Sequence, residues 1–299
     1  MNAIAMPESA ATGAFHAGEL QAQALAGFTT SGAGIRDYMP EQHRTFFATL
    51  NFLLLATTGD DGWPLATVVA GEPGFIASPD ERTLSIRAVP DPQDPVLSQL
   101  GEGSAVGMLG IDFRTRRRNR ANGIVNAVNV DGLQIGVRQS FGNCPKYIHA
   151  RDVAMTPVKA QAATDVHVFT GLNTAARELI SAATTFFVAT ASGRQASPGG
   201  VDISHRGGVA GFVKIDGDTL ICPDYLGNRY FNTLGNLMVE PRAALLFVDF
   251  SNGDVWHLRG KAEILWQTEE IQQFPGAERL WRFKVERGSR RGTGQLIAR

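Results

Sequence analysis

The sequence predicts a mainly β protein in which two small antiparallel β-barrels follow each other along one chain. Short apolar runs of strand length, such as FLLLAT at 52–57 and FFVAT at 186–190, are each closed by Gly, Asp or Ser turn residues. A set of dipeptides also recurs in the same order after 133 to 137 residues. A lone barrel of roughly 100 residues leaves an exposed rim, so we expect the two barrels to pack together as a pseudo-dimer within one chain.

The recurring dipeptides indicate an internal duplication. One such pair would carry no weight, but five in the same order are typical of a repeat. The five pairs are Ala56-Thr57 with Ala189-Thr190, Gly74-Phe75 with Gly211-Phe212, Thr83-Leu84 with Thr219-Leu220, Pro90-Asp91 with Pro223-Asp224, and Asp112-Phe113 with Asp249-Phe250.

Helix signals divide the chain into an arm and two barrels. Residues 1–14 are rich in Ala, Ser, Gly and Pro, and we expect them to be mobile. Helices are expected at 18–26, at 40–50 and, opening the second copy, at 173–183. The expected domains are an N-terminal arm at 1–39, a first barrel at 40–160, and a second barrel with a C-terminal extension at 161–299.

The second copy is expected to contain six strands and one short helix. The helix is placed in PDYLGNRYFNTLGNL at 223–237, with its N-cap at Gly227 or Asn228 and its end at Gly235-Asn236. A matching short helix is expected in the first copy. The expected strands are 185–191, 198–205, 209–215, 218–222, 243–250 and 254–265.

Composition excludes several function classes. A net charge of −1 gives no footprint for nucleic acid or an anionic membrane, and no apolar run approaches the roughly 20 residues of a spanning helix. The first residues lack the pattern of a secretory signal, and two cysteines, Cys144 and Cys222, make no disulfide framework. No H-x-x-x-H or C-x-x-C spacing suggests a metal site. We therefore expect a cytoplasmic protein with no nucleic-acid, membrane or metal partner.

Three stretches carry polar groups that could bind an anion. The start of the helix at 223–237 would present free N–H groups, with Arg229 in its first turn. In SHRGGVAGF at 204–212, alternation places Ser204 and Arg206 on one strand face and His205 on the other, before a glycine turn. A capping helix with a solvated arginine, and a structural histidine, are the alternatives.

The third stretch is FRTRRRNRANG at 113–123. If this segment is a strand, four arginines fall on one face, where they must meet water, carboxylates or an anionic ligand. The alternatives are a solvated hairpin arm and a nucleic-acid surface, although no aromatic stacking partners lie nearby. These arginines are Arg114, Arg116, Arg118 and Arg120.

Nucleophilic and nucleotide-triphosphate chemistry find little support. Cys144, in FGNCPKYI at 141–148, is a nucleophile only if a base lies beside it in space. No G-x-S-x-G motif, P-loop or dinucleotide fingerprint is present.

Six segments, in order along nearly the whole chain, resemble the pyridoxamine 5′-phosphate oxidase-like FMN-binding split-barrel proteins. The closest likeness is to larger tandem members with two barrels in one chain. The segments are FHAGE at 15–19, RRRNRANG at 116–123, FGNCPKYI at 141–148, DISHRGGVAGF at 202–212, PDYLGNRYFNTLGNL at 223–237 and LLFVDF at 245–250.

The resemblance implies one FMN at the junction between the two barrels. Strand and helix-start residues would hold the flavin phosphate, the helix asparagines would bond the ring edge or the ribityl chain, and the first barrel would add its arginine strand. The implied cofactor residues are Ser204, His205, Arg206, Asn228, Arg229, Asn232, Asn236, Arg116 and Arg118.

The sequence departs from the well-characterised oxidases in two places. Their usual Ser-Arg-Lys at the helix start is Gly227-Asn228-Arg229 here. The first copy has PDPQDP at 90–95 where the second has PDYLGN, and its three prolines remove N–H donors. We therefore expect the first copy to have lost its own flavin site.

The function expected from the resemblance is that of an FMN-dependent oxidoreductase. It would pass hydride to or from a small molecule, with NAD(P)H as one candidate donor and homodimerisation as one candidate assembly. The alternative is a non-catalytic flavin- or haem-binding storage or stress module of the same fold.

Overall fold

The computed structural model describes residues 13–88, 91–155, 166–193, 199–293 and 296–298. Several expectations fall outside these ranges: residues 1–12 of the expected mobile start at 1–14, Pro90, the first residue of the expected strand at 198–205, and the expected domain boundary at 160–161. Within them, no helix is both long enough and apolar enough to cross a membrane.

The first barrel is built on one seven-stranded sheet. Its strand order is β2-β1-β5-β6-β7-β4-β3. A helix, α2 (Glu41–Thr49), precedes it and packs with Phe46 and Phe47 against the core. The strands are β1 (Phe52–Thr58), β2 (Pro64–Ala70), β3 (Ile76–Asp80), β4 (Thr83–Ile86), β5 (Ala105–Asp112), β6 (Arg117–Asn129) and β7 (Gly132–Gly142).

The second barrel has the same architecture. Its sheet runs β11-β10-β14-β15-β16-β13-β12, with β9 (Val166–Thr170) added along β16. Helix α3 (Thr174–Ala182) precedes it as α2 precedes the first. The strands are β10 (Thr185–Ala191), β11 (Val201–Gly207), β12 (Lys214–Asp216), β13 (Thr219–Tyr225), β14 (Arg242–Asp249), β15 (Asp254–Leu265) and β16 (Ala277–Gly292).

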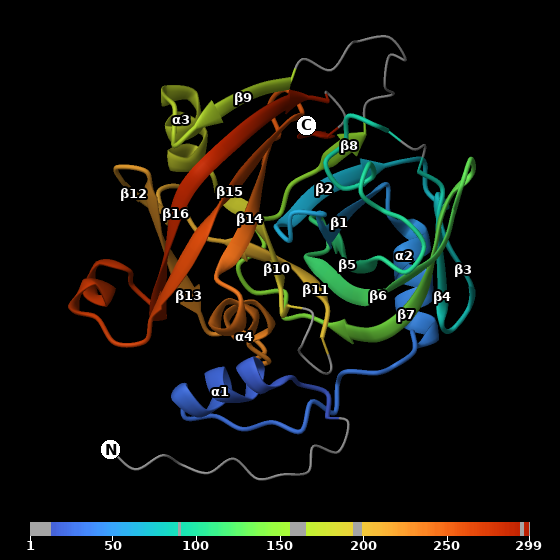
Figure 1. Cartoon of the computed structure of the whole chain (residues 1–299), viewed down its shortest axis with the longest axis horizontal. Coiled ribbons are helices and arrows are strands. Elements are labelled where there is room, and N and C mark those ends of the chain that lie inside the picture. Colours follow the sequence, from blue (N-terminus) through green and yellow to red (C-terminus); the bar gives the residue numbers. More distant parts are fainter. Residues whose placement is uncertain (1–12, 89–90, 156–165, 194–198, 294–295, 299) are drawn as a thin grey trace.

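The identical strand order confirms the mainly β fold and the tandem duplication. Strands β1 to β7 correspond one by one to β10, β11, β12, β13, β14, β15 and β16, and Figure 1 shows the two barrels side by side. The remaining elements are α1 (Ala17–Leu25), α4 (Asn232–Val239), η1 (Glu269–Gln273) and a small sheet of β8 (Val153–Met155) with β17 (Leu296–Ala298).

One of the five dipeptide pairs was matched wrongly. Strand β13 continues through Pro223 and Asp224, which pair with Leu280 and Arg279 of β16. In the first copy, β4 ends at Ile86, so Asp91 follows its strand and is not the counterpart of Asp224. Strand β16 itself, from a region expected to be an extension, lies inside the second sheet.

The short helix at 223–237 was also placed too early. Helix α4 begins at Asn232 and runs to Val239, so Gly235 lies inside it. Arg229 and Phe231 adopt left-handed backbone conformations, with φ of 58° and 60°, in the turn between β13 and α4. The first copy forms turns at 91–100 in place of the expected helix.

Strand bounds in the second copy were only partly correct. The ranges 185–191 and 254–265 are confirmed. The hairpin expected at 198–205 and 209–215 differs, because β11 extends to Gly207 and β12 contains only Lys214–Asp216.

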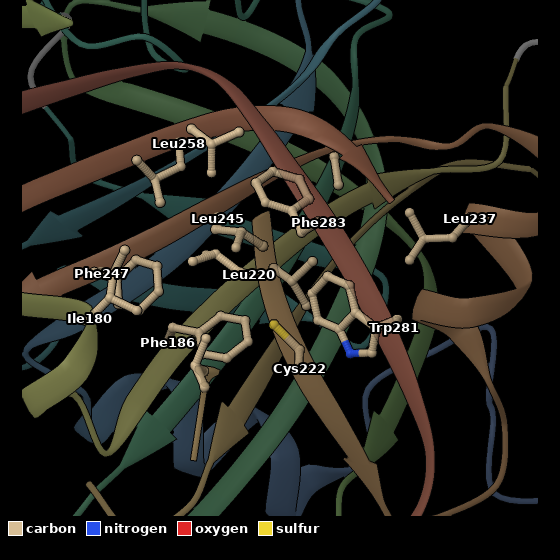
Figure 2. Packing of buried hydrophobic residues seen from close by; sticks show 14 of the residues in the cluster. Ile180, Phe186, Leu220, Cys222, Leu237, Leu245, Phe247, Leu258, Trp281 and Phe283 are labelled. Carbon is tan, nitrogen blue, oxygen red and sulfur yellow. The ribbon is translucent and has the colours of Figure 1, made fainter. Parts of the chain in front are cut away.

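Three apolar clusters hold the molecule together. One fills each barrel, and Figure 2 shows that of the second, where Phe186, Trp281 and Phe283 lie among aliphatic side chains. The third cluster joins the barrels, packing Phe52 and Leu54 of β1 with residues of β10, β11 and β14. The two barrels therefore share a continuous apolar seam.

The seam brings β5 against β11. Gly107 on β5 has no room for a side chain, since a Cβ there would lie 2.5 Å from the carbonyl oxygen of Val201. This close approach places β6, the neighbour of β5, near the polar residues of β11. Helix α1 lies against α4 (Figure 1), with Gly18 and Gly235 at the crossing.

Candidate functional site: an anion pocket between the barrels

A pocket opens where β6 of the first barrel faces β11, β13 and α4 of the second. Its enclosed cavity has a volume of about 90 Å³, and the space reaches about 660 Å³ when the open mouth is included. The first barrel contributes Arg118 and Arg120 from β6 and the segment Asn143-Cys144 after β7. The pocket therefore exists only because the two barrels are packed together.

The lining of this pocket carries an excess of positive charge. Of its described residues, five are arginines and two are carboxylates. Burial, together with the neighbouring guanidinium groups of Arg120 and Arg206, lowers the pKa of Arg118 to about 10. Cations held this close together favour an anionic ligand. The five are Arg118, Arg120, Arg206, Arg229 and Arg279, and the two are Asp224 and Glu278.

Three buried donors on residues that line the pocket lack a partner within the described chain. They are Nε of Arg120, Nε of Arg206 and Nδ2 of Asn143. Buried polar groups are nearly always hydrogen-bonded, and these three are all N–H donors. An oxyanion such as a phosphate group is the kind of ligand that such donors satisfy.

Arg120 is the centre of the polar wall behind the pocket. Its guanidinium donates to Asp202 Oδ1 at 2.9 Å, to Asn232 Oδ1 at 3.1 Å and to Ser204 Oγ at 2.5 Å. Thr233 also donates to Ser204 Oγ, at 2.9 Å. One arginine of the first barrel thus fixes a strand and a helix of the second.

Helix α4 begins at the pocket. Its N-cap, Phe231, offers no side-chain acceptor to the first N–H groups, and Phe231, Asn232 and Thr233 all line the pocket. A helix start with free N–H groups attracts negative charge. The helix start begins at Asn232 and lines the pocket, and its binding of an anion stays a prediction.

Most of the predicted cofactor residues lie together at this pocket. Asn228 bonds Asn143 across the barrel junction, and Arg229 donates to Glu278 Oε1 at 3.2 Å. Arg206 donates to Asp224 Oδ1 at 2.9 Å. The predicted residues that line the pocket are Arg118, Ser204, His205, Arg206, Asn228, Arg229 and Asn232.

Two predicted residues lie elsewhere. Arg116 was placed on the arginine face of a strand, but it sits exposed in the turn between β5 and β6 with φ of 57°. Arg114 lies in the same turn, so the stripe reduces to Arg118 and Arg120. Asn236, one turn further along α4, faces a second hollow and bonds His16 and Asp202.

His205 orients Arg118. Burial, followed by the nearby charge of Arg118, holds the pKa of His205 well below its usual range. The imidazole is therefore neutral, and its Nδ1 lies 3.0 Å from Nη1 of Arg118, which can only donate. Phe113 and Phe187 contact the edges of the ring and hold it in place.

Several lining residues were not in the predicted cofactor set. These residues reach the pocket from the segment after β7, from α4 and from β16; they are Asn143, Cys144, Thr233, Glu278 and Arg279. Asn143 and Cys144 belong to the segment FGNCPKYI that carried the family resemblance, which was the available signal. Arg279 could be found only once β16 was known to pair with β13.

A second hollow lies on the far side of the Arg120–Asp202 pair, beneath the N-terminal arm. It is lined by His16 and Glu19 of the arm together with Asp202 and Asn236. Burial, aided by the charge of Asp202, raises the pKa of Glu19 to about 8 against the lowering effect of hydrogen bonds from His16 N–H and Asn232. Glu19 therefore holds a proton at neutral pH.

The raised pKa of Glu19 predicts a stability that falls as pH rises from 7 to 8. The unfolded chain has already released this proton, while the folded chain holds it until about pH 8. The folded state therefore binds more protons, and the free energy of unfolding should decrease by about 1 kcal/mol across this interval. Urea unfolding at pH 7 and pH 8 measures the change.

Glu19→Gln is the matched control, since its side chain is neutral in both states. The variant should lose the part of the pH slope that comes from this position. Nearby His16 has a pKa lowered by burial and titrates below the interval. Equal slopes in the wild type and the variant would contradict a protonated Glu19.

The fold and the pocket define a two-barrel β protein with an arginine-rich pocket at the barrel junction. Residues 172–296 match the family model described as Pyridoxamine 5′-phosphate oxidase. The second barrel therefore matches the model of the family that the sequence resembles.

Three solved structures show weak overall similarity, each over about two fifths of the chain. A FAD-binding protein from Mesorhizobium loti is 13% identical and covers 42% of this chain and 97% of its own, with a TM-score of 0.29. A protein from Clostridium acetobutylicum related to general stress protein 26 of Bacillus subtilis is 19% identical, covers 42% and 91%, and has a TM-score of 0.28.

The third is an FMN-binding protein from Syntrophomonas wolfei. It is 19% identical and covers 38% of this chain and 80% of its own, with a TM-score of 0.28. No curated protein matches the chain significantly.

Proposed function

We propose that the pocket between the barrels binds FMN and that the protein is an FMN-dependent oxidoreductase acting on a small molecule. The carrying observation is the set of unpartnered N–H donors among surplus arginines at the start of α4. The match of residues 172–296 to the Pyridoxamine 5′-phosphate oxidase model supports the choice of a flavin phosphate over other anions.

The residues present fit a phosphate monoester. Arg118 and Arg206, from opposite barrels, would neutralise its charge, and Asn143 and the first N–H groups of α4 would donate to its oxygens. Bound FMN would supply hydride transfer, which needs no protein nucleophile. Cys144 then lines the pocket without a required chemical role.

The protein would bind, orient and shield the cofactor. Asn232 is held by Glu19 and Arg120, so its amide is fixed before any ligand arrives. We place the protein in the reducing cytoplasm, since its two cysteines are free.

Titration with FMN tests the proposal. Purified protein should quench the fluorescence of added FMN with saturation at one equivalent per chain, and the complex should show a flavin absorbance spectrum. Protein that remains colourless after incubation with FMN, and quenches nothing, would refute it.

Replacing Arg206 by alanine should weaken FMN binding by about 10- to 100-fold. The variant removes a charge-assisted hydrogen-bond donor from a partly desolvated site, which costs roughly 1.5–3 kcal/mol. The fluorescence titration measures the affinity. Arg116→Ala is the control, because Arg116 is exposed in the β5–β6 turn. This variant should bind FMN with the affinity of the wild type.

Reduction of bound flavin distinguishes an oxidoreductase from a storage module of the same fold. Under anaerobic conditions, NADH or NADPH should bleach the flavin band in a stopped-flow absorbance trace if either is the donor. Tight retention of oxidised flavin with both donors, and with other reductants of similar potential, would favour the storage function.

A further inference from the structure

The duplication gives the anion pocket a counterpart on the first barrel. Thr67 pairs with Leu55 on β1 just as Ser204 pairs with Val188 on β10, so Thr67 occupies in β2 the position that Ser204 holds in β11. Both copies therefore carry a side-chain hydroxyl at this position, Ser204 in the second and Thr67 in the first.

The wall opposite each hydroxyl comes from the other barrel. The strand registers identify the counterparts. Ser140 pairs with Ala121 in the first sheet and Gly288 pairs with Leu258 in the second, so Ser140 and Gly288 occupy equivalent positions. Three residues further on, Asn143 reaches the anion pocket, and its counterpart Arg291 binds Asp94, as Thr67 does. By the same registers, His257 takes the place of Arg120.

A carboxylate of the chain fills this counterpart. Asp94, only 2% exposed, accepts from Thr67 Oγ1 at 2.5 Å and from Arg291 Nη1 at 2.8 Å through the same oxygen. Its other oxygen accepts from the backbone N–H groups of Val96 and Leu97, each at 2.9 Å. A bound phosphate would accept hydrogen bonds from the same kinds of donor: a hydroxyl, a guanidinium and two backbone N–H groups.

The charge of the counterpart is reversed relative to the anion pocket. Arg291 also pairs with Asp91, so one guanidinium meets two carboxylates. Burial lowers the pKa of His257 to about 4, with Asp94 opposing and Arg291 adding to the effect, so the residue in the place of Arg120 carries no charge. A free phosphate group would be repelled.

We propose that the chain contains a second anion site of the same construction, held closed by Asp94 as its internal anion. Replacing Asp94 by a neutral residue should open this site to inorganic phosphate or a phosphate monoester. This inference rests on the duplicated fold and stands apart from the identity of the ligand in the first pocket. It also replaces the loss of N–H donors at prolines as the reason why the first copy would hold no flavin.

The test compares phosphate binding by the wild type with that of Asp94→Ser and of Asp91→Asn/Asp94→Ser. Serine keeps a short acceptor for the N–H groups of Val96 and Leu97, so the turn after it should persist, as circular dichroism can verify. Isothermal titration with inorganic phosphate should find one additional equivalent in the double variant. Its dissociation constant should be on the order of 1 mM or tighter.

Two further variants separate this inference from the first pocket. Adding Arg291→Ala to the double variant should abolish the additional equivalent. When Arg206→Ala is added to the double variant, the additional phosphate equivalent should persist. This triple variant should bind phosphate at least about tenfold more tightly than Arg206→Ala alone.

The outcomes are distinguishable. A folded double variant that binds no more phosphate than the wild type overturns the closed second site. A double variant that binds one equivalent more than the wild type, lost on Arg291→Ala, sustains the second site. The FMN titration decides separately whether the first pocket holds a flavin.

Discussion

Replacing Arg120 by alanine should lower the free energy of unfolding by about 3–5 kcal/mol, because breaking a buried ion pair leaves an uncompensated charge. The guanidinium is 4% exposed and donates to Asp202, Ser204 and Asn232. Without it, the Asp202 carboxylate stays buried with only the amides of Asn122 and Asn236 as donors. Urea or guanidinium unfolding followed by circular dichroism measures the loss.

The control for this prediction lies six residues earlier in the same stretch. Arg114 is exposed in the β5–β6 turn, where its ion pair with Asp112 spans 4.0 Å. Arg114→Ala should change stability by less than about 0.5 kcal/mol. A loss of similar size in both variants would mean that the Arg120 network contributes nothing beyond a general effect of charge.

Gly235→Ala should destabilise the protein by about 2–3 kcal/mol, although alanine is the better helix former. In an isolated helix the change would stabilise by about 1 kcal/mol. Here a Cβ at Gly235 would lie 2.6 Å from the Cα of Glu19, so α1 must move away from α4. Chemical denaturation measures the sign, and faster proteolysis of residues 13–27 should accompany it.

Gly101→Ala is the matched control. A Cβ at Gly101 meets no atom within 4 Å, so this substitution should be neutral or slightly stabilising. If Gly235→Ala also raised stability, the close crossing of α1 and α4 would be wrong.

Local patterns were sufficient for much of the fold. The helix at 40–50 and the strands at 185–191 and 254–265 follow from apolar spacing and turn residues, and the structure places them within a residue of the expected bounds. Ordered dipeptide repeats were sufficient for the duplication, because an insertion or deletion between copies changes their offset only slightly.

Long-range pairing explains what the sequence did not reveal. The start of α4 was misplaced because Arg229 and Phe231 adopt left-handed conformations in the turn before it. The extension of β13 through Asp224 and Tyr225 was missed because it depends on pairing with β16, which lies far along the chain. Similarly, alternation put Arg116 and Arg118 on one face, but the hairpin turn extends through Arg116 and removes it from the strand. Local sequence carries no signal for where a hairpin ends when both sides are polar.

The candidate site was predictable in composition and less so in geometry. Ser204, Arg206 and Asn228 could be proposed from the resemblance, whereas the central role of Arg120 depends on the packing of β5 against β11. That Asp94 closes the counterpart site depends on contacts between residues almost 200 positions apart.

The covalent link between the barrels has a consequence for dilute solution. In a dimer of separate chains, a site built from both subunits disappears when dilution dissociates them. Here Arg118 and Arg206 belong to different barrels of one polypeptide, joined by an apolar seam. Ligand affinity at this pocket should therefore be independent of protein concentration down to nanomolar levels. The covalent link keeps the two halves of the site at a high effective concentration, which dilution does not change.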